Sequence, residues 1–218
     1  MVTDRRRLGG ADDAEMCARL VDLVGAAVQA GVDLVQIRER DLDGRVLVDL
    51  VERCVRAAQR TPTRVVVNDR LDVAMAGGAA GVHLRSDSIA VRHVRRVARE
   101  TFLIGRSVHS ATEAAAVSNE GGADYLLLGT VLPTSSKPGI LHVAGLAELA
   151  AGVRAANIPV LAIGGVTLET LPEVARTGAA GFAAIGFFME GAVDGSDSRL
   201  RDRVETARRL FDRMSTGS

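Results

Sequence analysis

The sequence predicts an α/β protein, a single (β/α)8 (TIM) barrel of residues 1–218 whose first strand is short. Three observations lead to this prediction: a repeated junction between helix and strand, a series of short apolar runs, and polar residues that follow those runs. The length of 218 residues suits one barrel domain, since such barrels commonly fill about 200–250 residues. The final residues, 215–218, are expected to be flexible.

The repeated junction occurs at four places along the chain. Each has a glycine near a helix end, then small or acidic residues, then an apolar run; the four lie at 30–33, 78–81, 122–124 and 178–181. A glycine can take the left-handed conformation that ends a helix. The repeat therefore predicts a tight turn that leads each helix into a strand.

Seven short apolar runs are the candidate internal strands, at 34–37, 65–67, 82–84, 103–104, 125–128, 160–163 and 182–185. Continuous apolar runs are typical of strands buried on both faces. Helical periodicity separates them, as in residues 42–59. Residues 1–3 supply an eighth, first strand, so eight βα units closing into a barrel is the simplest interpretation. A doubly wound open sheet is the alternative.

Composition and charge exclude several classes of function. The apolar fraction of 47% is typical of a globular protein, and 27 basic residues balance 27 acidic ones. This balance predicts no nucleic-acid partner, and no apolar run reaches the ~18–20 residues of a membrane span. Cys17 and Cys54 lack metal-site spacing, so we expect buried thiols in a cytoplasmic protein. The basic run Arg5-Arg6-Arg7 is expected to be a solvated loop.

Polar residues gather where the predicted strands end, and a barrel places its active site at those carboxyl ends. This clustering predicts an enzyme. The segments concerned are 36–40, 68–70, 85–88, 105–109, 130–137, 164–167 and 185–186.

Two of these segments predict anion binding. Gly164 and Gly165 follow one strand, and Ile185 and Gly186 end the next; backbone N–H groups there can hold a phosphate. Residues 134–137 offer hydroxyls and one ammonium group, which suit a phosphate or pyrophosphate. Arg38 and Arg40 at another strand end make a second anion site plausible, with Gln36 beside them.

Two carboxylates are candidate ligands for a Mg2+ ion that bridges such oxygens, Asp69 and Asp87. Asp69 could instead cap a helix that begins near Leu71. His83 lies within a predicted strand and could face either the core or the mouth of the barrel.

These segments together resemble the thiamine phosphate synthase/TenI family, from Val2 to about Met189. The resemblance rests on 36–40, 67–69, 81–84, 105–109, 122–125, 133–137 and 162–165. It implies the (β/α)8 barrel, and it implies phosphorylated small molecules as partners.

The synthase branch of that family couples hydroxymethylpyrimidine diphosphate to thiazole phosphate and releases pyrophosphate with Mg2+. The resemblance then implies that Asp69 binds Mg2+ and that Gly165 and Gly186 hold the thiazole phosphate. Lys137 would be needed for turnover. The residues implied to hold the pyrimidine diphosphate are Arg38, Asn68, Ser107, Thr134, Ser136 and Lys137.

Three positions depart from the synthase pattern. Arg40 stands where the family has lysine, Ser88 replaces a second metal-binding aspartate, and Arg85 replaces a glycine. A hydroxyl is a far poorer Mg2+ ligand than a carboxylate, although Asp87 could compensate.

The TenI branch resembles the chain more closely at 37–40, 85–88 and 107–110. Its members tautomerise the thiazole phosphate carboxylate, which requires a proton shuttle but no Mg2+ or other cofactor. The histidine that some of them use is Thr130 here, so His109 or Glu39 would be the acid–base residue.

We therefore expect a TenI-like thiazole phosphate tautomerase. The alternatives are the Mg2+-dependent synthase and a non-catalytic regulator that binds a phosphate ligand. The sequence leaves open whether the chain forms a homo-oligomer.

Overall fold

The computed structural model describes residues 1–134, 143–189 and 197–215. Contacts divide the chain into two compact units, each made of two separate segments. The first unit is Met1–His83 with Ile185–Glu205, and the second is Leu84–Ala184 with Thr206–Ser218. Within the described ranges, no helix is both long enough and apolar enough to cross a membrane.

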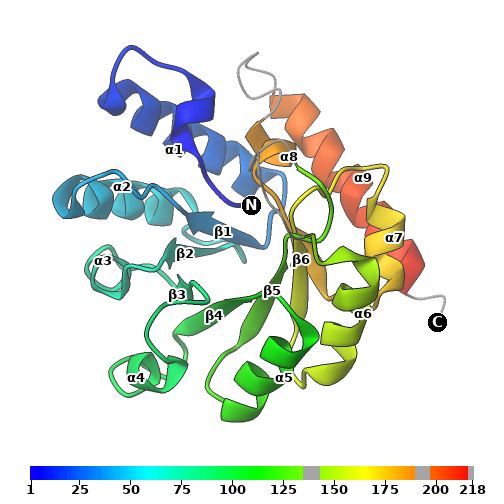
Figure 1. The fold of residues 1–218 in the computed structure, drawn as a ribbon. Helices are drawn as coiled ribbons and strands as arrows, with labels where there is room; N and C mark the ends of the chain where they lie inside the picture. Colours follow the sequence, from blue (N-terminus) through cyan, green and yellow to red (C-terminus); the bar gives the residue numbers. More distant parts are fainter. Residues whose placement is uncertain (135–142, 190–196, 216–218) are drawn as a thin grey trace. The chain divides into compact units, whose positions relative to one another are not determined.

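The described residues of the first unit form three parallel strands in chain order: β1 (Leu34–Ile37), β2 (Arg64–Asn68) and β3 (Gly81–Leu84). The last residue of β3 belongs to the second unit. Helix α1 packs beside α2, and α2 packs beside α3 (Figure 1). The helices of this unit are η1 (Arg5–Leu8), α1 (Asp13–Gln29), α2 (Gly44–Ala57), α3 (Leu71–Ala76), α8 (Gly186–Met189) and the first part of α9 (Asp197–Ser215).

The predicted first strand pairs with β1, as expected, but only as an isolated bridge. Val2 lies parallel to Gln36. The Thr3 amide donates to the Gln36 carbonyl at 3.0 Å, and the Gln36 amide donates to the Met1 carbonyl at 2.9 Å. The main chain of Gln36 is therefore held on this side by the N-terminal segment.

Leaving aside residues 135–142 and 216–218, the second unit has four parallel strands in chain order: β4 (Leu103–Val108), β5 (Tyr125–Gly129), β6 (Val160–Ile163) and β7 (Gly181–Ala183). Helix α5 packs beside α6. The helices of this unit are α4 (Val91–Arg95), α5 (Ala111–Glu120), α6 (Gly145–Ala155), α7 (Leu171–Arg176) and the second part of α9.

The glycine junctions take the predicted left-handed conformation. The φ angles are +83° at Gly31, +68° at Gly78, +84° at Gly122 and +81° at Gly178. Asp124, the acidic residue of one junction, accepts the Ile104 amide at 2.6 Å through Oδ2. The junction therefore joins the start of β5 to the start of β4.

Five strands differ from the predicted bounds: β2, β3 and β5 are longer by one or two residues, and β4 and β7 differ most. β4 continues to Val108 because Gly105–Val108 pair with Tyr125–Leu128, although Arg106 and Ser107 interrupt the apolar run. β7 stops at Ala183, because α8 begins at Gly186.

Strand order within each unit follows the chain without reversal. A doubly wound sheet requires a reversal of strand order, so the order in each unit favours the barrel prediction over the alternative. Every residue of β5 is buried, as expected for a strand covered on both faces.

Candidate functional site

Most candidate residues of the first unit lie at the carboxyl ends of β1 and β2. Ile37 is paired with Val67, so Arg38 and Asn68 follow at the same edge of the parallel sheet. Gln36 is buried, Arg38 and Asn68 are half-buried, and Arg40 is exposed. The register therefore places Arg38 and Asn68 at neighbouring positions of this edge, and their shared role in substrate binding stays a prediction.

Gln36 combines burial with an unsatisfied donor. Gln36 is 4% exposed, and its Nε2 atom has no hydrogen-bond partner within the described parts of the chain. A buried amide N–H without an acceptor is costly, so such a group is a sign of a site that a ligand or water completes. This supports the prediction that Gln36 contacts a substrate.

Glu39, predicted as an acid–base candidate, is buried in a polar network. The residue is only 4% exposed. Thr3 Oγ1 donates to Glu39 Oε1 at 2.6 Å, and the Arg5 amide donates to both carboxylate oxygens at 3.2 Å. Arg5 Nη1 donates to Oε2 at 3.2 Å. The carboxylate is thus engaged by the N-terminal segment.

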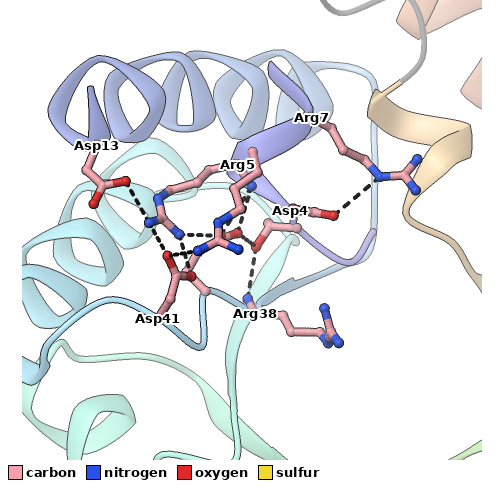
Figure 2. Close-up of polar contacts among 9 residues, drawn as sticks. Asp4, Arg5, Arg7, Asp13, Arg38 and Asp41 are labelled. Carbon is pink, nitrogen blue, oxygen red and sulfur yellow. Dashed lines mark hydrogen bonds and ion pairs between the residues drawn. The ribbon is translucent and has the colours of Figure 1, made fainter. Parts of the chain in front are cut away.

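The expectation that the basic run 5–7 is a solvated loop is wrong for its first member. The Arg5 side chain is 1% exposed, while the Arg6 side chain is 67% exposed. Figure 2 shows Arg5 between Asp13 of α1 and Asp41. Arg5 is buried because three carboxylates surround it, which compensates the desolvation of its charge.

Asp41 receives a bidentate contact from Arg5, with Nη1 at 2.8 Å and Nη2 at 2.5 Å. The hydrogen bond from Arg5 holds the pKa of the Asp41 carboxyl well below its usual range. The same hydrogen bond raises the pKa of Arg5 further above its usual range. The pair therefore stays ionised throughout the neutral range.

Asp69, a candidate Mg2+ ligand, follows β2 with a φ of +60°. Its amide donates to the His83 carbonyl at 2.9 Å. Arg70, not Asp69, stands at the N-cap position of α3, and no side chain hydrogen bond caps the helix there. His83, which lies within β3, is buried, with 2% of the residue exposed.

His109, the other acid–base candidate, is fixed by both ring nitrogens in the second unit. Nδ1 lies 2.5 Å from the Gly129 carbonyl, and Nε2 lies 3.2 Å from Ser86 Oγ. A carbonyl only accepts, so Nδ1 carries the proton, and in the neutral ring Nε2 accepts from the Ser86 hydroxyl. The ring joins the segment after β3 to the end of β5.

Asp87, the second candidate Mg2+ ligand, forms an ion pair with Arg85, and its side chain is 65% exposed. The segment around it is held by Arg106, which donates to the carbonyls of Ser86 at 2.9 Å and Ile89 at 2.7 Å. Among the described residues, no three His, Cys, Asp or Glu side chains gather as metal ligands.

Gly164 and Gly165, predicted to hold a phosphate, permit close packing between the segments after β5 and β6. Their φ angles are +99° and +70°. A Cβ on Gly164 would lie 2.5 Å from Thr130 Cγ2, and one on Gly165 would lie 2.5 Å from the Pro133 carbonyl oxygen. Close packing alone therefore explains why glycine occupies both positions. Phosphate binding by these residues stays a prediction.

The other predicted residues are distributed as follows. Ser107 lies in β4, paired with Leu127, and Thr134 is half-buried at the end of the described segment. Ile185 and Gly186 lie in the first unit, at the start of α8. Ser136 and Lys137 lie outside the described residues.

Sequence reasoning did not identify three polar anchors: Thr3, Arg5 and Arg106. For Arg106, the signal is a charged residue inside an otherwise apolar strand. For Arg5, the signal is a charge that directly follows the short first strand, next to Asp4. Neither signal identifies a partner, because the partners are distant in sequence.

Comparison with known proteins gives a consistent result. A family model described as thiamine monophosphate synthase matches residues 11–188. The thiamine-phosphate synthase of Methanoculleus marisnigri is 38% identical over 188 residues, which cover 86% of this chain and 89% of that protein. That of Roseiflexus castenholzii is 35% identical over 185 residues, 85% of this chain and 78% of that protein. The solved thiamine phosphate pyrophosphorylase from Pyrococcus furiosus matches with a TM-score of 0.76 and 31% identity over 94% of each chain.

Proposed function

The chain belongs to the thiamine monophosphate synthase family, and from this premise we propose that it couples hydroxymethylpyrimidine diphosphate to thiazole phosphate, with release of pyrophosphate. The observation that carries the proposal is the 38% identity over most of both chains with a protein named thiamine-phosphate synthase. The relatives compared are named for the coupling reaction, so they favour it over the tautomerisation expected from the sequence.

We also propose that the eight strands close into a (β/α)8 barrel of one domain. The chain-order pairing in each unit supports this, as does the match over 94% of the Pyrococcus furiosus structure. In such a barrel all strands deliver their carboxyl ends to one face.

The pyrimidine diphosphate would be held by groups from several strand ends. In the first unit, Gln36 offers a buried donor, and Arg38 and Asn68 stand beside each other at the edge of the sheet. Ser107, Thr134, Ser136 and Lys137 would add hydroxyls and a cation. Leaving pyrophosphate accumulates negative charge, which donors fixed in advance stabilise more than mobile water does.

Lys137 differs in type from every other basic residue of the sequence. It is the only lysine of the sequence, and the other 26 of the 27 basic residues are arginines. An ammonium group offers a compact charge that can follow a moving phosphate oxygen, whereas the planar guanidinium prefers a fixed fork. The choice of lysine here supports a role on the leaving group.

The thiazole phosphate would be held by backbone N–H groups of Gly164 and Gly165 together with Ile185 and Gly186. The left-handed conformation of the two adjacent glycines exposes successive backbone groups that side chains would otherwise cover. Binding through the main chain leaves side chains free to recognise the ring.

The carboxylates fit a Mg2+ ion in part. Asp69 follows β2 beside Asn68 and offers one carboxylate, and Asp87, which forms an ion pair with Arg85, offers another. A Mg2+ ion bound there would neutralise diphosphate oxygens. Sites of this kind use one or two carboxylates and take their other ligands from phosphates and water.

The test is pyrophosphate release from the two substrates, with Mg2+ and with EDTA. We expect metal-dependent release, abolished by Lys137→Ala. Arg45→Ala, which removes an exposed cation from α2, is the control and should retain wild-type turnover. Absence of release in the wild type would contradict the proposal and return attention to the tautomerase.

A second test does not depend on turnover. Because Lys137 is the only lysine, an amine-acylating reagent can modify only its side chain and the N-terminal amine. We expect pyrophosphate with Mg2+ to slow the acylation of Lys137, as mapped by mass spectrometry. Equal acylation with and without pyrophosphate would contradict a role for Lys137 in binding.

A further inference from the structure

The segment that bears Gln36 and Arg38 is fixed from one side by residues 1–5. The main-chain groups of Gln36 pair with Met1 and Thr3. The Arg38 amide donates to Thr3 Oγ1 at 2.9 Å. Two of the residues that the proposed function assigns to the diphosphate, Gln36 and Arg38, are therefore held by contacts with residues 1–3.

Thr3 is the central connection in this arrangement. It is 0% exposed, and its hydroxyl accepts from Arg38 N while it donates to Glu39 Oε1 at 2.6 Å. A hydroxyl can do both at once, because it has one donor and two acceptor sites. Valine has nearly the same shape but can do neither.

Arg5 fixes the same segment from its other end. Four hydrogen bonds run from its guanidinium, to Glu39, to both oxygens of Asp41, and to Asp13 of α1. Residues 39 and 41 are thus tied to a helix as well as to the first strand. Figure 2 shows the Arg38 side chain extending away from Arg5 and Asp41, while its main-chain amide is bonded to Thr3.

We propose that Thr3 and Arg5 are positioning residues for the pyrimidine diphosphate: through Glu39 and Asp41 they fix the main chain from which Gln36 and Arg38 reach the substrate. This inference rests on the proposed function. Neither residue contacts the substrate in this arrangement, and Glu39 serves as an anchor, not as an acid or base.

A positioning role predicts a selective change in kinetics. A relaxed main chain at 36–41 should weaken binding of the pyrimidine diphosphate, because the substrate would then have to order the donors that the network now fixes in advance. The thiazole phosphate is assigned to other groups. A purely structural role would instead lower the melting temperature and the folded fraction, and it would leave both KM values of the folded enzyme unchanged.

The experiment compares Thr3→Val with Thr3→Ser, assayed well below the melting temperature of each variant. For Thr3→Val we expect the KM for hydroxymethylpyrimidine diphosphate to rise at least about tenfold and the KM for thiazole phosphate to stay within about twofold. Thr3→Ser keeps the hydroxyl and should restore both values. Titration calorimetry with inorganic pyrophosphate and Mg2+ should show the same loss and the same rescue.

Arg5→Met tests the other end, with Arg6→Met as its control. Arg6 lies in the same η1 turn and contacts the same Asp41, but it is largely exposed. Arg5→Met should reproduce the selective rise in KM, and Arg6→Met should not. If Arg5→Met fails to fold, the comparison of Thr3→Val with Thr3→Ser tests the proposal by itself.

The outcomes separate the two proposals. An active wild type whose Thr3→Val variant keeps a wild-type KM for the pyrimidine diphosphate overturns the positioning role alone. An equal rise in both KM values also overturns it. A wild type that releases no pyrophosphate overturns the proposed function and this inference together.

Discussion

Gly165 is a residue at which one methyl group should matter. Its φ is +70°, and a Cβ would lie 2.5 Å from the Pro133 carbonyl oxygen and 2.6 Å from Leu132 Cβ. We expect Gly165→Ala to destabilise the protein by at least about 1–3 kcal/mol in urea unfolding. Gly25→Ala is the matched control: it lies in α1 with nothing within 4 Å and should be neutral or stabilising by about 0.5–1 kcal/mol. Equal effects would contradict the packing argument.

Cys54 gives a prediction in alkaline solution. It is 0% exposed in α2, as the sequence predicted for both cysteines, and burial raises the pKa of its thiol to about 12. The unfolded thiol ionises from about pH 8.5 while the folded one stays protonated, so stability falls as pH rises through this window.

The measurement is urea unfolding of the wild type and of Cys54→Ala between about pH 8 and about pH 11. The wild type should lose up to about 1.4 kcal/mol per pH unit more than the variant does. Parallel curves would show that the thiol is accessible to water in the folded state.

At the scale of elements, Asp124 joins β4, β5 and α4. Its Oδ2 accepts the Ile104 amide at 2.6 Å and Arg95 Nη2 at 2.7 Å. Asp124→Ala leaves a partly buried amide without an acceptor, and we expect a loss of about 1–2 kcal/mol. Glu120→Ala removes a carboxylate that is also 38% exposed but pairs only with Arg92 in the described contacts. This control should change stability by less than about 0.5 kcal/mol.

The elements were largely predictable because their signals are local. The bounds of β1 and β6 match the apolar runs, and the junction glycines have positive φ angles as predicted. The ends of β4 and β7 could not be read in this way. β4 continues through Arg106 and Ser107 because β5 pairs with it, and pairing between strands leaves no trace in the hydropathy of one strand.

At the scale of the whole molecule, the two units are not separable pieces of chain. Each is made of two segments, and the boundary falls inside β3 after His83 and inside α9 after Glu205. Separate unfolding of one unit would have to break both elements. We therefore expect one cooperative transition, with equal calorimetric and van't Hoff enthalpies. Two resolved transitions would contradict the prediction of a single domain 1–218.

The candidate site was predictable only in outline. A barrel assigns function to strand ends, so the segments containing Arg38, Asn68 and His109 could be selected from the sequence. The partners of Arg5, Glu39 and Asp87 could not be, because a charged residue in a sequence does not reveal whether its counter-charge is nearby. For Arg5 those partners are 34 and 36 positions away at Glu39 and Asp41.

The ties between residues 3–5 and 39–41 also constrain how the family can diverge. A new residue at 39 or 41 removes one of the three carboxylates that compensate the buried charge of Arg5, a loss that a change at position 5 would offset. Substitutions at positions 3, 5, 39 and 41 should therefore be inherited together among homologues. For the same reason, the segment 36–41 of a relative cannot be grafted as a cassette: chimeras should retain activity only when residues 1–5 are transferred from the same parent.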